Sequence, residues 1–235
     1  MNWLARLFGA KPELTPEQAE RLAAWKALPA PDLNAPHAAS RYVVVDVETS
    51  GLNLVKDRLI AIGAVAVLGG RQIQLADSME IILQQRRVSG HDNILIHGIG
   101  GTAQSEGIPP VDALLTFLEY LGKSPLVAFH VAFDQTMIDR ALKTFLGLKF
   151  KHSWADLAYI APALYPELAR SHRSLDQWMS RFGLGNYARH SALADALSTA
   201  ELMLALRERM DTKQVDSFKA MRDLDKAQRM VNWTG

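Results

Sequence analysis

The stretch that most constrains the fold is residues 41–52, RYVVVDVETSGL. Residues 42–45 are apolar, and three of the four are β-branched, which is typical of a buried strand. Ser50 and Gly51 indicate that this strand ends in a turn. Two acids, Asp46 and Glu48, stand at its end, where further apolar residues would suit a core.

Asp46 and Glu48 are two residues apart, so in a strand their side chains project from the same face. Neighbouring carboxylates that are partly buried repel each other unless cations or hydrogen bonds compensate. No Lys or Arg lies between Tyr42 and Val55, so the local sequence supplies no partner. Hard divalent cations such as Mg²⁺ prefer carboxylate oxygens. The pair alone is a weak signal, because it also suits a solvent-facing strand edge, but it makes a cation site the first hypothesis.

The rest of the chain predicts a sheet flanked by helices. Residues 58–68 and 71–83 favour two more strands around a two-residue turn at Gly69-Gly70, which gives an antiparallel three-strand meander. A fourth strand is expected at 125–129 and a loop at 93–101. Helices are expected at 15–28, from Pro109-Pro110 to Gly122, and at 134–146, 154–164, 174–182 and 191–210, with one more within 211–235. This order predicts an α/β fold with a mixed sheet, in which parallel strands extend the meander.

Three parts are expected along the chain: a helical extension and linker over residues 1–40, a main domain over 41–210, and a helical extension over 211–235. The first helix has a capping box, with Thr15 as N-cap and Gln18 at N3. Before it, an apolar stripe from Trp3 to Phe8 fits either a partner or membrane surface or packing on this protein's own domain. The last helix either packs back on the domain or reaches for a partner.

Composition narrows the function classes. The chain has 235 residues, a formal net charge of +1 and no cysteine, so disulfides, thiolate nucleophiles and cysteine-bound metals are excluded. The N-terminal apolar cluster is too short for a signal peptide, and no apolar run reaches the roughly 18 residues that span a bilayer. We therefore expect a cytoplasmic protein without membrane contact. The sequence lacks a P-loop, a G-x-S-x-G elbow and an H-E-x-x-H motif.

Two later carboxylates strengthen the cation hypothesis. Asp134 follows the fourth strand in FHVAFD, and Asp195 lies in HSALADA, each close to a helix start. The positive end of a helix dipole eases the cost of a carboxylate there. Each Asp taken singly reads as an ordinary helix-start acid. His190 precedes Asp195 by five residues, just ahead of a plausible N-cap at Ser191, although a lone histidine is more often structural than catalytic.

The stretches DVETSGL, HVAFD and HSALAD, in this order over residues 41–205, resemble the three motifs of the DEDD superfamily of 3′→5′ exonucleases. The resemblance is to the subgroup with a motif-three histidine, whose members include the proofreading subunit of bacterial replicative DNA polymerases. Residues 96–99 are similar to the family's loop beside the substrate pocket, and residues 172–184 to the segment before motif three. The resemblance implies a ribonuclease H-like fold with the exonuclease domain at residues 41–210.

The resemblance also implies roles for individual residues. Asp46, Glu48, Asp134 and Asp195 would hold two Mg²⁺ or Mn²⁺ ions, and His190 would be the general base. The residues near the terminal nucleotide would be Thr49, Gly51, Leu52, His97 and Phe133, although Phe133 fits a core position equally well. The family often has His-Asn-Ala before the Phe-Asp of motif two. Here His130-Val131-Ala132 stands in its place, and His130 is given no role.

The expected activity is release of nucleoside 5′-monophosphates from the 3′ ends of single-stranded or frayed DNA, in proofreading or repair. One alternative keeps the chemistry and makes the substrate RNA. Another is a non-catalytic subunit that binds nucleic acid or a polymerase, against which the complete acidic set argues. A DNA polymerase would be bound through residues 1–40 or 211–235.

Overall fold

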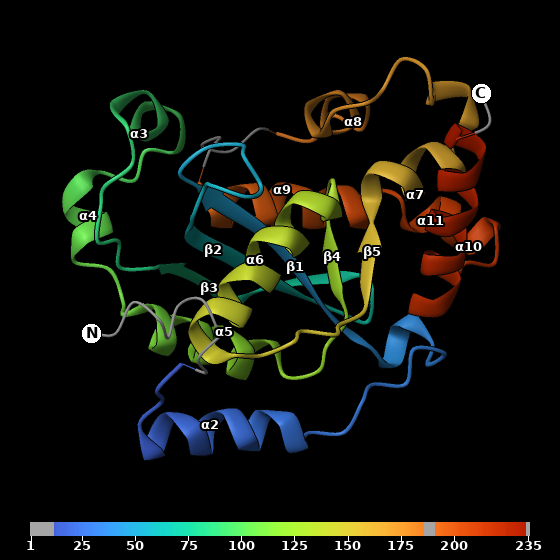
Figure 1. Cartoon of the computed structure of the whole chain (residues 1–235). Coiled ribbons are helices and arrows are strands. Elements are labelled where there is room, and N and C mark those ends of the chain that lie inside the picture. Colours follow the sequence, from blue (N-terminus) through green and yellow to red (C-terminus); the bar gives the residue numbers. More distant parts are fainter. Residues whose placement is uncertain (1–11, 186–190, 234–235) are drawn as a thin grey trace.

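The computed structural model of the chain describes residues 12–185 and 191–233. Its centre is one mixed sheet with the strand order β3-β2-β1-β4-β5 (Figure 1). The strands are β1 (Arg41–Thr49), β2 (Leu59–Leu68), β3 (Gln72–Ile82), β4 (Leu126–Ala128) and β5 (Trp154–Asp156). The first three pair antiparallel, whereas β4 pairs parallel with both β1 and β5. The predicted mixed sheet, a meander extended by parallel strands, is confirmed.

Helices cover both faces of the sheet (Figure 1). One face carries α2 (Pro16–Ala27), α5 (Pro110–Leu121) and α6 (Val131–Leu146). The other carries α7 (Leu157–Leu164), α8 (Leu175–Arg181), α9 (Ala192–Ala205), α10 (Arg207–Thr212) and α11 (Phe218–Trp233). Two short helices, α3 (His91–His97) and α4 (Gly101–Ser105), lie beyond the β3 edge, and single 3-10 turns lie at His37–Ala39 and Pro166–Leu168.

The alternation of side chains along β1 separates two apolar layers. Val43, Val45 and Val47 are buried in the layer that contains α5 and α6. Tyr42 and Val44 are buried in the layer that contains α9. Because the side-chain period of a strand is two, the acids at positions 46 and 48 lie on the α9 face.

Local sequence signals are confirmed where they depend on backbone chemistry. Thr15 and Gln18 form both hydrogen bonds of the predicted capping box. Gly69 and Gly70 have φ angles of 59° and 61°, and the N–H of Arg71 donates to the carbonyl of Leu68, which closes the turn between β2 and β3. A turn with two consecutive positive φ angles favours glycine at both positions, because side chains rarely tolerate them.

Four element predictions are corrected. Residues 154–164 are not one helix, because the first three form β5 and only Leu157–Leu164 is helical. The stretch expected as a loop at 93–101 is helical at both ends, in α3 up to His97 and in α4 from Gly101, and only residues 98–100 connect the two helices. Its apolar residues gave no helical stripe, since Leu95 and Ile96 face solvent. The helix expected at 191–210 is interrupted at Leu206, and α6 begins three residues before position 134.

Both terminal helices pack on the main body. Trp25 of α2 donates from its indole nitrogen to the carbonyl of Gly122 at 2.7 Å. Phe218 and Met221 of α11 are buried beside Ile160 of α7, so the last helix packs back on the domain. The apolar stripe from Trp3 to Phe8 lies outside the described residues. The division of the chain at residues 40 and 210 stays a prediction.

Among the described helices, none combines the length and the apolar character that crossing a bilayer requires.

Asp139 on α6 provides a test of electrostatics away from the acidic site. Burial raises the pKa of its carboxyl from 3.8 to about 6, so the folded protein holds this proton more tightly than the unfolded chain. Its contribution to stability is therefore complete below pH 3.8 and is lost as the pH rises toward 6. We expect Asp139→Asn to stabilise the protein above pH 6 by about 1 kcal/mol, after discounting for solvent screening at this half-exposed site.

The measurement is the Tm of both proteins across pH. Asp139→Asn should melt about 2–4 °C higher at pH 7.5 and together with the wild type near pH 4. Equal Tm values at pH 7.5 would contradict the assignment.

Candidate active site

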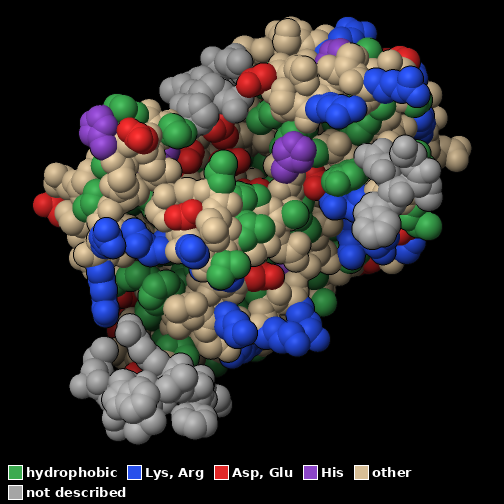
Figure 2. Space-filling model, turned by 45° about the horizontal axis from the view of Figure 1, so that its top comes forward, with side chains coloured by type: hydrophobic (Ala, Val, Ile, Leu, Met, Phe, Trp, Pro, Cys, Tyr) green, Lys and Arg blue, Asp and Glu red, His purple; other side chains and the backbone are tan. Residues whose placement is uncertain are grey.

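Three carboxylates meet where β1 ends. Asp46 and Glu48 come from β1, and Asp195 comes from the first turn of α9, where it is buried. One carboxylate oxygen from each of the three lies within 4.8 Å of the other two. Residues far apart in the sequence thus form one acidic cluster. In Figure 2, acidic side chains gather in a hollow on the side of the molecule that faces the reader.

A glycine lets α9 come this close to the sheet. Gly63 in β2 pairs with Asp46, and a Cβ at Gly63 would lie 2.0 Å from the carbonyl carbon of Ala192. Glu80 of β3 then fixes the helix start, because its carboxylate accepts from the hydroxyl of Ser191 at 3.0 Å and from the N–H of Leu193 at 3.3 Å. Sequence reasoning missed both residues. A glycine inside an otherwise apolar strand was the available signal of a close backbone approach.

Asp134 lies near the cluster and comes from the helix layer on the opposite face of the sheet. It lies in the first turn of α6 and is 4% exposed. The pKa of the Asp134 carboxyl is raised, mainly by burial and further by the charges of Asp156 and Glu48. Backbone hydrogen bonds, one of them from Val47, oppose this rise. Asp134 does not belong to the group of three within 4.8 Å, but it lies close enough to Glu48 to be affected by its charge.

Asp156, which sequence reasoning placed inside a helix, holds the start of α6. Asp156 is buried, and its carboxylate accepts from the backbone N–H groups of His130 at 2.9 Å and Val131 at 3.1 Å. It also accepts from Ala158 at 3.0 Å and from the guanidinium of Arg229 on α11 at 2.8 Å. Burial raises the pKa of Asp156, and the charge of Arg229 opposes that effect. The available signal was an acid directly after a short apolar run.

His130 occupies the N-cap position of α6 with a φ angle of 66°, in the left-handed region that costs a non-glycine residue free energy. Its ring packs edge-on against Phe129, with the centroids 4.8 Å apart. The two hydrogen bonds to Asp156 compensate this backbone conformation. They fix the turn from which Asp134 projects.

Arg229→Met should therefore destabilise the protein and disturb α6. Removing one partner of a buried pair costs about 3–5 kcal/mol. We expect about 2 kcal/mol here, because Arg229 is 38% exposed whereas Asp156 is 2% exposed. The measurement is the Tm, with an expected loss of about 4–8 °C.

The matched control is Lys219→Met, which removes an exposed pair with Asp223 one turn away on the same helix. Its effect on the Tm should be much smaller. Equal losses in the two variants would show that the buried network does not hold the helix in place.

The loop after β1 is held by polar contacts among its own residues. Asp57 accepts from the hydroxyl of Ser50 at 2.9 Å and from the N–H of Asn53 at 2.8 Å. Thr49 donates to the carbonyl of Gly51 at 2.7 Å. Gly51 has a φ angle of 154°, and a Cβ there would lie 2.6 Å from the Asp57 carboxylate. These contacts leave Leu52, the next residue, 86% exposed.

Residues of α3 line a second part of the same region. A hollow of about 480 Å³ is bounded by Glu80, Ser191 and the segment 95–100. His97 contributes to it, but both of its ring nitrogens are engaged: Nδ1 accepts from the N–H of Ile99 and Nε2 donates to Asn93, each at 2.9 Å. Burial lowers the pKa of His97, in agreement with this neutral tautomer, which is assigned from the partners.

Two predicted site residues remain, Phe133 and His190. Phe133 is half-buried and packs against the apolar layer of α5 and α6. His190 lies outside the described residues. Of the five residues predicted to carry the chemistry, the structure brings Asp46, Glu48 and Asp195 together and places Asp134 beside them.

The donor set fits a hard divalent cation. The cluster consists of carboxylate oxygens, which Mg²⁺ and Mn²⁺ prefer over nitrogen or sulfur. Three acids within 4.8 Å repel one another, and a bound cation would relieve this repulsion and favour the ionised form of Asp134 as well.

Comparison with known proteins agrees with this geometry. A model of the exonuclease family RNase_T matches residues 43–203. PolC-type DNA polymerase III of Thermotoga maritima is 31% identical over 183 residues, which are 78% of this chain and 13% of that protein. The Bacillus subtilis PolC-type enzyme is 32% identical over 166 residues, which are 70% of this chain and 11% of that protein. The chain thus spans only about an eighth of the length of these relatives.

Solved structures with lower identity share the fold. Escherichia coli exonuclease I in complex with a dT13 oligonucleotide has a TM-score of 0.61 and 17% identity, over 74% of this chain and 42% of that chain. Exonuclease X in complex with 5′ overhanging duplex DNA has a TM-score of 0.60 and 20% identity, over 78% of this chain and 99% of that chain.

The strand order and the acids at the end of β1 define a ribonuclease H-like α/β fold, as the sequence predicted. The chain belongs to the exonuclease family, with the motifs of the DEDD 3′→5′ exonucleases.

Proposed function

We propose that this protein removes nucleotides from the 3′ ends of DNA and releases nucleoside 5′-monophosphates. The observation that carries the proposal is the convergence of Asp46, Glu48 and Asp195 within 4.8 Å. Asp134, buried beside Glu48, completes the set. A non-catalytic binding subunit has no need of three acids within 4.8 Å and a fourth close to them, since they repel a phosphate backbone.

Asp46, Glu48, Asp134 and Asp195 would hold two divalent cations, Mg²⁺ or Mn²⁺. When bound, two such cations would activate the attacking water and stabilise charge on the departing 3′-oxygen. The chain's own contribution is to hold four carboxylates in place through β1, α6 and α9. Gly63, Glu80 and Asp156 position those elements, so each of the three acts through an acid and not on the substrate.

His190 is proposed as the general base that takes the proton of the attacking water. An imidazole with an ordinary pKa of about 6.5 is largely neutral at pH 7.5 and can accept that proton. We expect His190→Ala to lower kcat by about 10²–10⁴-fold with an unchanged Tm. In the wild type, kcat should fall as the pH drops below about 6.5. The measurement is the pH profile of kcat, and a His190→Ala enzyme with the wild-type profile would refute the role.

The terminal nucleotide is proposed to lie between the loop after β1 and helix α3. Leu52, Leu95 and Ile96 expose apolar side chains there, which suit the faces of bases. Thr49 and Gly51 hold the loop that presents Leu52, and His97 holds the turn after α3. Phe133, which is half-buried, is proposed to contact the base from the start of α6.

DNA is favoured over RNA because the relatives named above are DNA polymerases and the two solved neighbours named above contain DNA. The same relatives suggest a role in proofreading or repair, with a DNA polymerase as partner. Residues 1–40 and 211–235 are the segments proposed to bind it. A cytoplasmic location belongs to the same proposal.

The test is digestion of 5′-labelled oligonucleotides with Mg²⁺ or Mn²⁺, with and without a chelator. A ladder that shortens from the 3′ end, depends on metal and yields 5′-mononucleotides would support the proposal. DNA and RNA of equal sequence are compared in parallel. No cleavage of either, under conditions where the oligonucleotide binds, would leave the binding-subunit alternative standing.

A further inference from the structure

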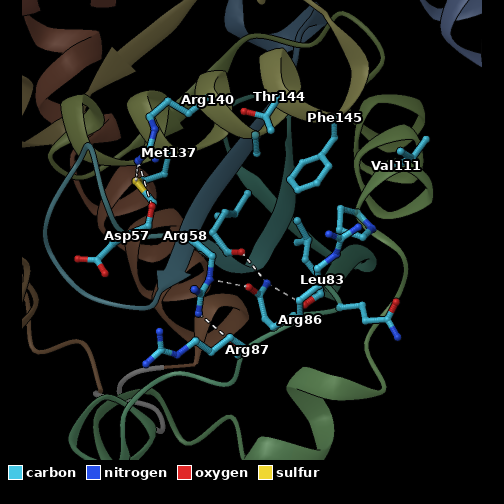
Figure 3. A pocket seen from close by; sticks show the side chains of 15 residues that line it. Asp57, Arg58, Leu83, Arg86, Arg87, Val111, Met137, Arg140, Thr144 and Phe145 are labelled. Carbon is cyan, nitrogen blue, oxygen red and sulfur yellow. Dashed lines mark hydrogen bonds between the residues drawn. The ribbon is translucent and has the colours of Figure 1, made fainter. Parts of the chain in front are cut away.

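A second cavity, of about 870 Å³, opens on the other side of the loop after β1. Its walls come from residues 57–59, from the segment 83–87 after β3, and from α5 and α6 (Figure 3). Its floor is apolar and consists of Leu59, Leu83, Val111, Met137, Ala141 and Phe145. Ligand pockets in proteins commonly measure about 300–1,000 Å³, so this cavity can take a nucleotide-sized group.

Four arginines surround this apolar floor, and we call the whole feature the arginine cavity. They are Arg58, Arg86, Arg87 and Arg140. Within residues 12–185 and 191–233, the one carboxylate that lines the cavity belongs to Asp57, which already accepts from Ser50 and Asn53. None of the four arginines forms an ion pair in this part of the chain. The local excess of positive charge contrasts with a net charge of +1 for the whole chain.

Two of these arginines are fixed by neutral acceptors. Arg58 donates to the side-chain oxygen of Gln85 at 3.1 Å and to the backbone carbonyl of Arg87 at 2.7 Å. Arg140 donates to the carbonyls of Leu54, Val55 and Asp57. These bonds hold the guanidinium groups in place without neutralising them, which preorganises them for an anion. Arg86 and Arg87 carry exposed side chains at the mouth.

The combination of chemistry points to nucleic acid. Guanidinium groups match the oxygens of a phosphate, and the half-buried ring of Phe145 offers a face for a base. One loop also connects the lining of the cavity to the strand that carries two acids of the cluster. The N–H of Arg58 donates to the hydroxyl of Ser50 at 3.0 Å, and Ser50 follows Glu48 by two residues.

We propose that the arginine cavity binds phosphates and a base of a single-stranded nucleic acid, upstream of the 3′ end that lies at the acidic cluster. The inference rests on the proposed function for the identity of the strand. It adds a binding site that the hydrolysis itself does not require. The cavity would hold a long strand between successive cleavages. A dinucleotide bound at the acidic cluster would be too short to contact the cavity.

The test variant is Arg86→Glu combined with Arg87→Glu, since neither side chain donates a hydrogen bond to another described residue. The matched control is Lys149→Glu combined with Lys151→Glu. This pair carries the same charge change but precedes β5, at the opposite end of the parallel strands from the acidic cluster. Hydrolysis of a dinucleotide and of a 12-nucleotide single strand is measured for each protein.

For the cavity variant, KM for the 12-mer should rise about tenfold at unchanged kcat. Dinucleotide hydrolysis should stay within about twofold of the wild type, and the control should match the wild type on both substrates. The dependence of binding on salt should also weaken, by about 0.7 in the slope of log K against log salt for each phosphate that the variant no longer binds. A 12-mer KM equal to that of the control would overturn the proposal.

Binding of a fluorescent 12-mer to the Asp195→Asn protein separates this proposal from the proposed function. If no protein cleaves DNA but the 12-mer still loses affinity on reversal of Arg86 and Arg87, the cavity proposal stands and the exonuclease proposal fails. If the wild type cleaves DNA but the affinity for the 12-mer is the same with and without the charge reversal of Arg86 and Arg87, only the cavity proposal fails. If the charge reversal weakens the binding of polyglutamate but not that of the 12-mer, the nucleic-acid proposal is overturned and the cavity is assigned to an acidic peptide.

Discussion

We expect Asp46→Ala to abolish hydrolysis and also to remove the effect of Mg²⁺ on thermal stability. Asp46 belongs to the cluster, with carboxylate oxygens of Glu48 and Asp195 within 4.8 Å. Loss of one preorganised charge-stabilising group from an active site costs about 10²–10³-fold in kcat. A shared cation ligand should cost at least the upper end of that range.

Metal binding supplies a second readout that needs no turnover. A ligand at 100 times its Kd stabilises the folded state by about 2.7 kcal/mol, which for a chain of this size corresponds to roughly 5–10 °C in Tm. We expect this rise for the wild type and none for Asp46→Ala. Without metal, Asp46→Ala should melt slightly higher than the wild type, because one source of repulsion in the cluster is gone.

The matched control is Asp92→Asn, which removes a fully exposed carboxylate from α3. It should keep both the hydrolysis and the rise in Tm. Wild-type turnover by Asp46→Ala, or an unchanged rise of its Tm with Mg²⁺, would refute the assignment of the site.

Gly63→Ala should separate α9 from the sheet and so take Asp195 away from the cluster. The added Cβ would lie 2.0 Å from the carbonyl carbon of Ala192 and 2.1 Å from the nitrogen of Leu193. Both atoms are backbone, so no side-chain rotation relieves the overlap. Overpacking of this kind costs about 1–3 kcal/mol, occasionally more, and a 1 Å displacement of a catalytic group can cost about 10²-fold in rate.

We expect Gly63→Ala to lose several degrees in Tm, to bind Mg²⁺ weakly and to hydrolyse DNA at least about 100-fold more slowly. Thermal melting, a Mg²⁺ titration of Tm and kcat measure the three effects. Gly90→Ala is the control, since its φ angle is −62° and no atom lies within 4 Å of the added Cβ. Equal behaviour of the two variants would show that α9 does not depend on this contact.

Short-range chemistry made much of the fold predictable. The capping box at Thr15, the two glycines of the β2–β3 turn and the glycine that ends α5 act within four residues, and all three are confirmed. The acidic pair of β1 was predictable for the same reason, because a period of two fixes its face. Strand β5 was not, because three residues show no periodicity. Helix α3 was not, because its apolar residues are exposed.

The sequence by itself determined the family through three motifs, and it determined that Asp46 and Glu48 share a face. Only the tertiary structure decided that Asp195 joins them, since that depends on Gly63 leaving room for the backbone of α9. It also decided that Asp156 and Arg229, 73 residues apart, together hold the start of α6. The physical reason is range: backbone propensity and side-chain periodicity act between neighbours, whereas a site forms only where separate elements pack.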